Sequence, residues 1–323
     1  MELPAYSGAE GHIDLVGGRT HCMVDQPLDR ETVNAIDRFK MLIGFMPLRA
    51  VQQTILQSET FWATAEDEAE EIDLAAIETE WEEAKDAIEP LAYDLEDVAI
   101  EPLPDDPEVK AHIEELAEME FFTDTYGDTD EHYELGMVPI DHLIARQASV
   151  TVTGHREIPS WSDDPLGVIA YTLPKERHQG VFQQAIQSSD NSMVGYQFTS
   201  RAPNISIHDV SIVDTGQPMM KSILFRLRAP PNIVNVWRVN DRLLLNNGYH
   251  RIYQLMSQGE THAPAVIRDS DKIRRTGDFT EEELLGDRPP VLPDFESDIS
   301  TTIRKPATND LIRITAESTE VYR

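Results

Sequence analysis

The sequence predicts an α+β protein in which an acidic, helical N-terminal region precedes a β-rich module. Apolar residues recur at helical spacing in the first third of the 323-residue chain, and short runs with period-two alternation follow Tyr126. Charge is also unevenly distributed: segment 66–120 has 23 acidic and two basic residues, and segment 201–275 has 11 basic and six acidic ones. We therefore expect three parts, an acidic helical region (1–125), a β-rich module (126–276) and a C-terminal tail (277–323) that packs on the body.

Helical periodicity starts in segment 30–63, where Gly44 to Pro47 interrupts it and Pro47 suits the first turn of a second helix. An apolar stripe at alternating spacings of three and four then runs through residues 66–88. Prolines after it predict an extended connector, and a further helix is expected over 107–122. The acidic side chains of this region then cover a solvated helical face, with a partner-binding surface as the alternative.

Strands are predicted in the second half of the chain. The runs 149–153 and 168–172 are short and rich in β-formers, and turn residues surround them. The runs 205–213, 222–228 and 233–238 alternate apolar and polar residues, as half-buried strands do. These five runs make residues 126–276 a β-rich module.

The segment 232–268 has the most specific pattern. Asn240-Asp241 is a hairpin turn signal between two strands, although no glycine follows it. The second strand ends in Asn-Asn-Gly, a helix is expected to begin at Tyr249 or His250, and Gly259 is expected to end it in the left-handed conformation. A third strand follows over 263–267.

A strand, a glycine turn and a helix N-terminus together form an anion site from backbone geometry. The first N–H groups of a helix have no internal partner, and the helix dipole places partial positive charge there. Gly248 would let a phosphate approach the backbone, Arg251 would add a bidentate fork, and His250 a further donor. The positive balance of segment 201–275 agrees with an anionic ligand.

The residues Gly248-Tyr249-His250-Arg251, in this context of hairpin, helix, Gly259 and a Pro264-containing strand, resemble the core of the ParB/sulfiredoxin superfamily. Members carry a Gly-x-x-Arg turn that cradles nucleotide phosphates, CTP in ParB proteins and ATP in sulfiredoxins. The resemblance covers about residues 200–270 and implies that Gly248, Tyr249, His250 and Arg251 bind phosphate.

Two departures narrow what the resemblance implies. Sulfiredoxins have a cysteine where this chain has Tyr249, and a tyrosine cannot form the thiosulfinate that their chemistry requires. ParB partition proteins have consecutive arginines in the turn and a helix-turn-helix domain after it, and neither is found here. Sulfiredoxin activity and an ordinary partition function are therefore disfavoured.

The expected function is binding of a nucleotide or another phosphorylated ligand at residues 248–251. Whether Mg²⁺-dependent phosphate chemistry follows, and so whether the protein is an enzyme, is open. Asp209, Asp214 and Asp241 are carboxylates of the module that could hold Mg²⁺ or act as a base, and the sequence singles out none of them. No catalytic residue is assigned.

The alternative is a non-enzymatic structural or interaction protein of a viral or plasmid-encoded assembly. In that case the fold is a scaffold, and the acidic helices contact a protein partner. A Gly-x-His-Arg turn also occurs without a ligand, when the arginine pairs with a nearby carboxylate. DNA cleavage by a ParB-like nuclease would need a metal-binding carboxylate cluster beside a basic groove, and the sequence shows no such cluster.

Metal sites and a catalytic cysteine have little support. His208, His250 and His262 match no standard zinc spacing. Cys22 is the single cysteine, so it forms neither an internal disulfide nor a thiolate cluster. Near His12 and His21 it could form a nucleophile pair, but a lone cysteine is more often a small buried residue. We therefore expect no metal site.

The composition limits where the protein works. With 59 acidic and 27 basic residues its net charge is −32, and the basic residues divide into 7 Lys and 20 Arg, a pattern that resembles proteins of salt-loving archaea. The isoleucine content is higher than expected for a GC-rich halophile, so this assignment stays open. The sequence has no stretch of 18 apolar residues and no secretory signal, so we expect a cytoplasmic protein with no membrane partner. In low salt this charge opposes nucleic-acid binding over the whole surface, and local binding is undecided.

Overall fold

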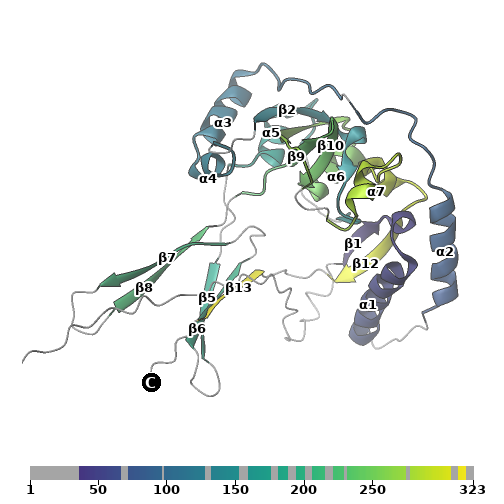
Figure 1. Ribbon diagram of the computed structural model, residues 1–323, viewed down its shortest axis with the longest axis horizontal. Helices are drawn as coiled ribbons and strands as arrows, with labels where there is room; N and C mark the ends of the chain where they lie inside the picture. The colour runs from purple at the N-terminus through teal and green to yellow at the C-terminus, as the bar shows by residue number, and fades with distance from the viewer. Residues whose placement is uncertain are drawn as a thin grey trace, which may run out of the picture. The chain divides into compact units, whose positions relative to one another are not determined.

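The computed structural model describes residues 36–66, 72–96, 98–127, 132–152, 159–175, 181–187, 194–200, 206–214, 221–228, 231–273, 277–306 and 312–317. Helices and sheets with antiparallel and mixed pairing give it an α+β fold (Figure 1). Contacts divide the chain into two compact units, and the smaller one contains part of the predicted β-rich module together with the end of the chain. The helices of the acidic region thus belong to the same unit as the segment with the Gly-Tyr-His-Arg turn.

A mixed five-stranded sheet forms the centre of the larger unit, with strand order β2-β11-β9-β10-β3. β9 and β11 run parallel, and β9 and β10 form the antiparallel hairpin that the sequence predicts. Asn240 and Asp241 both have positive φ, 50° and 61°, as a two-residue hairpin turn requires. The strands are β2 (Tyr133–Pro139), β3 (Ile144–Ala145), β9 (Asn235–Val239), β10 (Arg242–Asn247) and β11 (His262–Asp269).

Helix α6 (Tyr249–Ser257) connects β10 to β11 and begins where it was predicted. Ile252 and Leu255 are fully buried in the main core, against apolar residues of the sheet such as Leu244 and Val236. Gly259 has φ 87°, which confirms its expected left-handed position after the helix. The hairpin, the helix and the parallel strand therefore follow one another as the sequence predicts.

A second, three-stranded sheet in this unit corrects one prediction. Residues 36–41, expected to be helical, form strand β1 (Ile36–Met41), which pairs with β12 (Thr301–Pro306) and β4 (Ser149–Thr151). Both partners are distant in sequence, so this pairing leaves no local signal and overrides the apolar spacing. The strand predicted at 149–153 is confirmed by β4.

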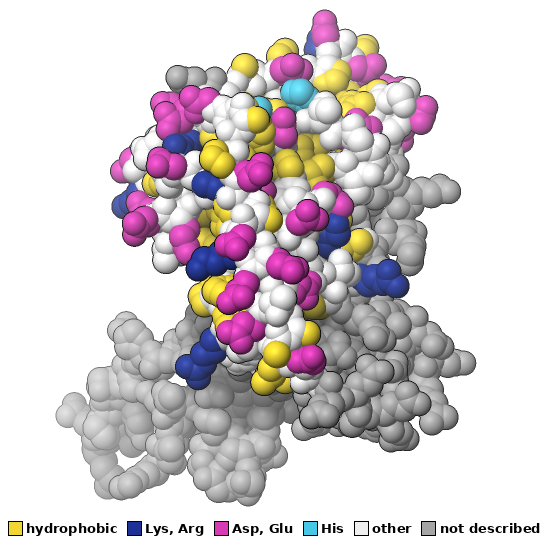
Figure 2. Space-filling view, turned by 90° about the vertical axis from the view of Figure 1, so that its right-hand side faces the viewer, with side chains coloured by type: hydrophobic (Ala, Val, Ile, Leu, Met, Phe, Trp, Pro, Cys, Tyr) yellow, Lys and Arg dark blue, Asp and Glu magenta, His cyan; other side chains and the backbone are white. Residues whose placement is uncertain are grey.

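Helices α1 (Leu48–Glu66) and α2 (Leu74–Asp86) follow η1 (Ile43–Phe45). α1 begins directly after Pro47, as expected. α2 buries Ile77 and Ala84, and the Trp81 indole donates to the carbonyl of Met46 at 2.7 Å. Carboxylate side chains spread over the face of the molecule on which α2 lies (Figure 2). The exposed acidic residues of α2 are Glu78, Glu80, Glu82, Glu83 and Asp86.

The connector after α2 is described over residues 88–96 and 98–106, where it has bends and no helix or strand, apart from an isolated bridge between Glu101 and Met137. The helix expected over 107–122 is present but broken near Met119, so that α3 (Pro107–Ala117) and α4 (Glu120–Phe122) result. The π-helical turn η2 (Thr123–Gly127) continues from α4. Phe122, Tyr126 and their neighbours form a second apolar cluster against the sheet.

The apolar run 168–172, predicted as a β-rich run, lies in helix α5 (Pro165–Thr172). Asp164 caps it by accepting the Gly167 amide at 2.8 Å, and Pro165 occupies its first turn. The periodicity of a short apolar run cannot distinguish a buried strand from a buried helix. Here Asp164 and Pro165, directly before the run, indicate the start of a helix.

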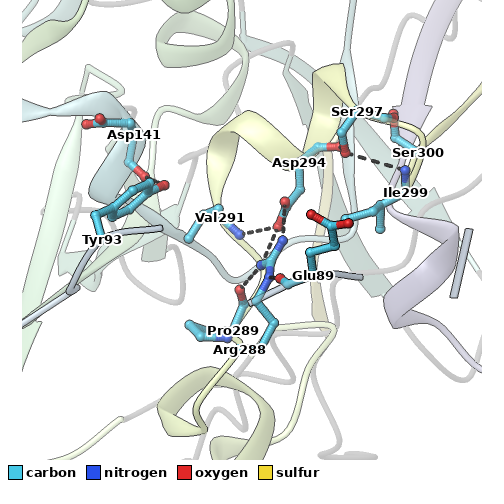
Figure 3. Close-up of polar contacts among 10 residues, drawn as sticks. All are labelled: Glu89, Tyr93, Asp141, Arg288, Pro289, Val291, Asp294, Ser297, Ile299 and Ser300. Atoms are coloured by element: carbon cyan, nitrogen blue, oxygen red, sulfur yellow. Dashed lines mark hydrogen bonds and ion pairs between the residues drawn. The ribbon is translucent and has the colours of Figure 1, made fainter. Parts of the chain in front are cut away.

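The C-terminal segment packs on the larger unit through α7 (Glu281–Leu285), η4 (Leu292–Glu296) and β12. The buried Asp294 holds this segment together (Figure 3): both its oxygens accept from Arg288, at 2.6 and 2.9 Å, and one accepts the Val291 amide. Arg288 also donates to the carbonyl of Glu89, which fixes the connector to the C-terminal segment. Nearby, η3 (Ile140–His142) receives a hydrogen bond from Tyr93 of the connector.

The smaller unit contains a two-stranded ribbon and a three-stranded sheet. The ribbon pairs β7 with β8, near the predicted strands 205–213 and 222–228. The sheet has the order β13-β6-β5 and is antiparallel throughout. The strands are β5 (Val181–Gln187), β6 (Val194–Ser200), β7 (Ser206–Asp214), β8 (Lys221–Arg228) and β13 (Ile312–Glu317).

Candidate functional site

The predicted turn lies at the junction of β10 and α6. A bulge between Leu245 and Asn247 ends the regular pairing of β10, and Gly248 then adopts φ 100° as the residue that opens the helix. A Cβ atom at Gly248 would lie 2.7 Å from Val234 Cγ2 and 3.2 Å from Val234 Cα. Glycine is therefore required here both by its backbone conformation and by the close approach of Val234, the residue before β9.

No side chain caps the N-terminus of α6. The helices α2, α3, α5 and α7 of the same unit each begin with an Asp or Thr side chain that accepts a first-turn amide. α6 has a left-handed glycine at that place instead. The amides of Tyr249 and His250 thus lack the side-chain acceptor that stabilises the other helix starts.

Tyr249 is buried, and its hydroxyl is used within the fold. It donates to the Leu245 carbonyl and accepts the Arg146 amide at 2.7 Å. Burial raises the pKa of Tyr249, and the contacts with Arg146 oppose this effect without cancelling it. The ring of Tyr249 therefore packs in the main core next to the turn.

His250 is exposed at the second position of α6. Its Nδ1 accepts the backbone N–H of Thr151 in β4 at 2.9 Å. In the neutral ring this bond places the proton on Nε2. His250 thus fixes the start of α6 to strand β4.

Arg251 lies in the first turn of α6 with its guanidinium largely buried. Nη1 donates to the carbonyls of Tyr171, at 2.9 Å, and Thr172, at 3.1 Å, at the end of α5. Nη2 is buried without a hydrogen-bond partner in the described part of the chain. Burial lowers the pKa of Arg251 to about 10, and no carboxylate of the described residues counteracts this effect. Among the described residues, the partners of this partly exposed arginine are helix-end carbonyls and not carboxylates.

A network of buried polar side chains next to the turn was not expected from the sequence. Asn246, in the bulge, accepts from Arg146 and donates to Asn235 at 2.9 Å, and Asn235 donates to Tyr126 at 3.2 Å. The guanidinium of Arg146 lies 4.3 Å from the ring of Trp237. The pair Asn246-Asn247 before Gly248 was a usable signal, because two amides rarely end a buried strand without partners.

Of the carboxylates suggested for Mg²⁺, Asp241 belongs to the same unit as the turn but does not lie at it. Asp241 is at the hairpin tip, at the far end of the six-residue strand β10, about 20 Å from Gly248. It lines a recess of about 440 Å³ together with Arg238 and Asp269, and Arg238 is paired there with Asp269 at 2.6 Å. Asp209 and Asp214 belong to β7 in the other unit.

The three histidines belong to different elements of the fold. His250 is at the start of α6, His262 begins β11 beyond the end of that helix, and His208 lies in β7. No three metal-ligating side chains come together among the described residues. Cys22, His12 and His21 lie outside these residues.

Comparison with known proteins finds no matching family model, no matching curated protein and no matching solved structure. Within the described ranges, no helix combines the length and apolar character needed to cross a membrane.

Proposed function

We propose that the turn 248–251 binds a phosphate-bearing ligand, a nucleotide or another phosphorylated small molecule, at the start of α6. The observation that carries the proposal is the combination of an uncapped helix N-terminus with a buried arginine in its first turn that no described carboxylate neutralises. Leaving a charge buried without an opposite charge costs free energy, and a bound anion would recover part of it.

The four residues of the turn have different roles in this proposal. Gly248 allows the close backbone approach, the amides of Tyr249 and His250 donate to phosphate oxygens, and the exposed His250 ring adds a donor. Arg251 acts from behind the turn through its charge, while Nη1 keeps its bonds to the end of α5. Tyr249 supports the turn with its ring and its inward hydroxyl.

The order of elements around the turn supports the resemblance to the ParB/sulfiredoxin superfamily as part of this proposal. A hairpin precedes the Gly-x-His-Arg turn, a helix follows it, and β11 then runs parallel to β9. In that superfamily the same turn binds nucleotide phosphates, which is why nucleotides come first among the candidate ligands. Mg²⁺ would arrive with the nucleotide, since Asp241 is too distant to hold it at the turn.

The alternative is that this fold is a scaffold in a larger assembly. The observation that favours it is the use of the Tyr249 hydroxyl and Arg251 Nη1 inside the fold. In this case the exposed carboxylates of α2 would face a protein partner. The two proposals differ in whether any phosphate compound binds.

A calorimetric titration with phosphate compounds distinguishes the phosphate proposal from the scaffold proposal. The ligands are CTP, ATP, ADP, a nucleoside monophosphate and pyrophosphate, each with and without Mg²⁺, at dilute and at molar KCl. The phosphate proposal expects saturable binding of at least one compound. If none binds under any of these conditions, the scaffold proposal replaces it.

Arg251→Gln tests the role of the charge, because glutamine loses the charge but keeps N–H donors for the α5 carbonyls. A matched control is Arg242→Gln: Arg242 also donates to helix-end carbonyls, those of Leu285 and Gly286, but it has Glu96 as an ion-pair partner. Loss of a charge-assisted contact worth about 1.5–3 kcal/mol corresponds to a roughly 10- to 150-fold weaker affinity. This loss is expected for Arg251→Gln and not for Arg242→Gln, and equal affinities of wild type and Arg251→Gln would refute the role of Arg251.

A further inference from the structure

The chain leaves the larger unit and returns to it next to the turn. The boundary between the units falls shortly beyond the end of α5 and again just ahead of β9. The described residues of the larger unit at these two passages are 171–175, which we call the exit segment, and 232–234, which we call the return segment. The amide of Val234 donates to the carbonyl of Thr172 at 2.9 Å, so the two segments lie side by side.

The exit segment is held by the arginine of the turn. Arg251 Nη1 donates to the carbonyls of Tyr171, at 2.9 Å, and Thr172, at 3.1 Å. The last carbonyls of a helix have no amide partner within it, and a positive charge is favourable there. His112 of α3 contacts the next carbonyl, that of Leu173, through Nε2 at 2.8 Å. The end of α5 is therefore fixed by one side chain of α6 and one of α3.

The return segment is held by the residues that open the turn. The side-chain amide of Asn247 donates to the side chain of Asn232. Val234 lies so close to Gly248 that a Cβ atom on this glycine would come within 2.7 Å of Val234 Cγ2. Residues 247–251 thus contact both segments, although the inserted part of the smaller unit separates these segments in sequence.

Groups that are held by the same contacts are expected to open together. Opening of the first turn of α6 would break the bonds from Arg251 to α5 and remove Gly248 from Val234. The hydrogen bond between Val234 and Thr172 would then lose the contacts on both sides of it. Amide hydrogen exchange detects such local cooperative openings. A ligand that binds only the closed form makes the opening rarer, and it does so for every group that opens with the site.

We propose that the turn 248–251, the exit segment and the return segment open and close as one unit, so that a phosphate compound bound at the turn stabilises both passages of the chain. This regulation rests on the proposed function of the turn. Coupling between two equilibria is reciprocal, so a change that loosens the return segment also weakens binding at the turn. The turn thereby links ligand binding in the larger unit to the segments from which the inserted part begins and ends.

Hydrogen exchange of the full chain without ligand tests the common opening. Arg251→Met removes the donors to the α5 carbonyls and keeps an apolar side chain. The control Lys175→Met removes a different contact of the exit segment, its ion pair with the exposed Glu115 of α3. We expect the amide of Val234 to exchange at least several-fold faster in Arg251→Met and at the wild-type rate in Lys175→Met. Unchanged exchange in Arg251→Met, or equal acceleration in both variants, would overturn the common opening.

The coupling to a ligand is tested with CTP, ATP and pyrophosphate as probes, each with Mg²⁺. A bound probe should slow the exchange of the return segment, by a factor that reaches about 100 when the free probe is at about 100 times its Kd. Asn232→Ala, a change outside the turn, should weaken the affinity of that probe several-fold in calorimetry, whereas Lys175→Met should leave it unchanged.

The outcomes distinguish this inference from the proposed function. A probe that binds at the turn and leaves the exchange of the return segment unchanged would overturn the coupling, while the proposed function stands. Equal affinities of wild type and Asn232→Ala would overturn the coupling in the same way. If none of the probes binds, the regulation fails together with the proposed function. Faster exchange of Val234 in Arg251→Met would then still support the common opening of the turn and the two segments.

Discussion

Asp294 accepts from Arg288 and Val291 of its own segment, and Arg288 links this segment to the connector at Glu89, so the removal of Asp294 tests the packing described above. Its side chain is 7% exposed and that of its partner Arg288 is 16% exposed. Asp294→Ala would remove both acceptors of the Arg288 guanidinium and leave the buried amide of Val291 without its partner. Arg288 would keep its bonds to the carbonyls of Glu89 and Pro289.

The expected cost follows from these contacts. Removing one partner of a buried ion pair costs about 3–5 kcal/mol, because the other charge stays in the protein. Arg288 retains some contact with water and two carbonyl acceptors, so we expect the low end, about 3 kcal/mol. Asp294→Asn keeps one acceptor oxygen and the shape of the side chain, and it should cost less. Adding Arg288→Met to Asp294→Ala should recover part of the loss, since the uncompensated charge is then gone.

Urea unfolding at fixed KCl, followed by tryptophan fluorescence, measures this free energy. All four tryptophans of the chain fall in the larger unit, so the signal reports on it. The control is Asp105→Ala in the exposed pair Lys110–Asp105, for which no measurable change is expected. If Asp294→Ala unfolds at the same urea concentration as this control, with an unchanged slope, the pair does not hold the segments together.

Three further predictions concern other parts of the chain. Gly248→Ala should lower the free energy of unfolding by about 1–3 kcal/mol, which is more than Gly259→Ala should. Both residues have positive φ, but only the new Cβ at Gly248 would meet Val234. Equal losses of free energy in urea unfolding would refute this close approach. Burial would raise the pKa of Glu296, but hydrogen bonds from Lys40 and Tyr253 outweigh this effect and lower it. Its stabilising contribution is thus present near neutral pH and is lost as pH falls through the lowered pKa, so the difference in melting temperature between wild type and Glu296→Gln should shrink as the solution is acidified. A difference that stays constant as pH falls would contradict this. Melting temperature should rise from dilute to molar KCl because like-charge repulsion in segment 66–120 is screened, and a flat or falling curve would remove the salt-adaptation hypothesis.

Local sequence signals were sufficient where the structure is local. The turn Asn240-Asp241, the start of α6 after Gly248 and its end before Gly259 all lie where the sequence places them. α1 likewise begins directly after Pro47. In each case a residue with a restricted or unusual backbone preference marks the boundary, and that preference does not depend on distant parts of the chain.

Predictions failed where distant partners decide the conformation and where an apolar run has no informative periodicity. Residues 36–41 form a strand because β12 and β4 pair with them. The sequence around Phe39 has no local signal for that pairing. The run 168–172 is apolar throughout, so its periodicity is uninformative, and Asp164 caps the helix that forms there. The two errors therefore differ in origin: pairing with distant strands outweighed a weak intrinsic propensity at 36–41, whereas at 168–172 the deciding signal was the local Asp164-Pro165 pair.

The sequence by itself determined the turn 248–251: its glycine, its position between strand and helix, and the positive charge nearby. The tertiary structure decided what each side chain of the turn does. Tyr249 turns its hydroxyl to the carbonyl of Leu245, and Arg251 reaches the end of α5, which is about 80 residues away in sequence. A backbone turn is set by the conformational preferences of a few adjacent residues, whereas the partners of a buried polar side chain are those groups that the rest of the fold brings within hydrogen-bond distance.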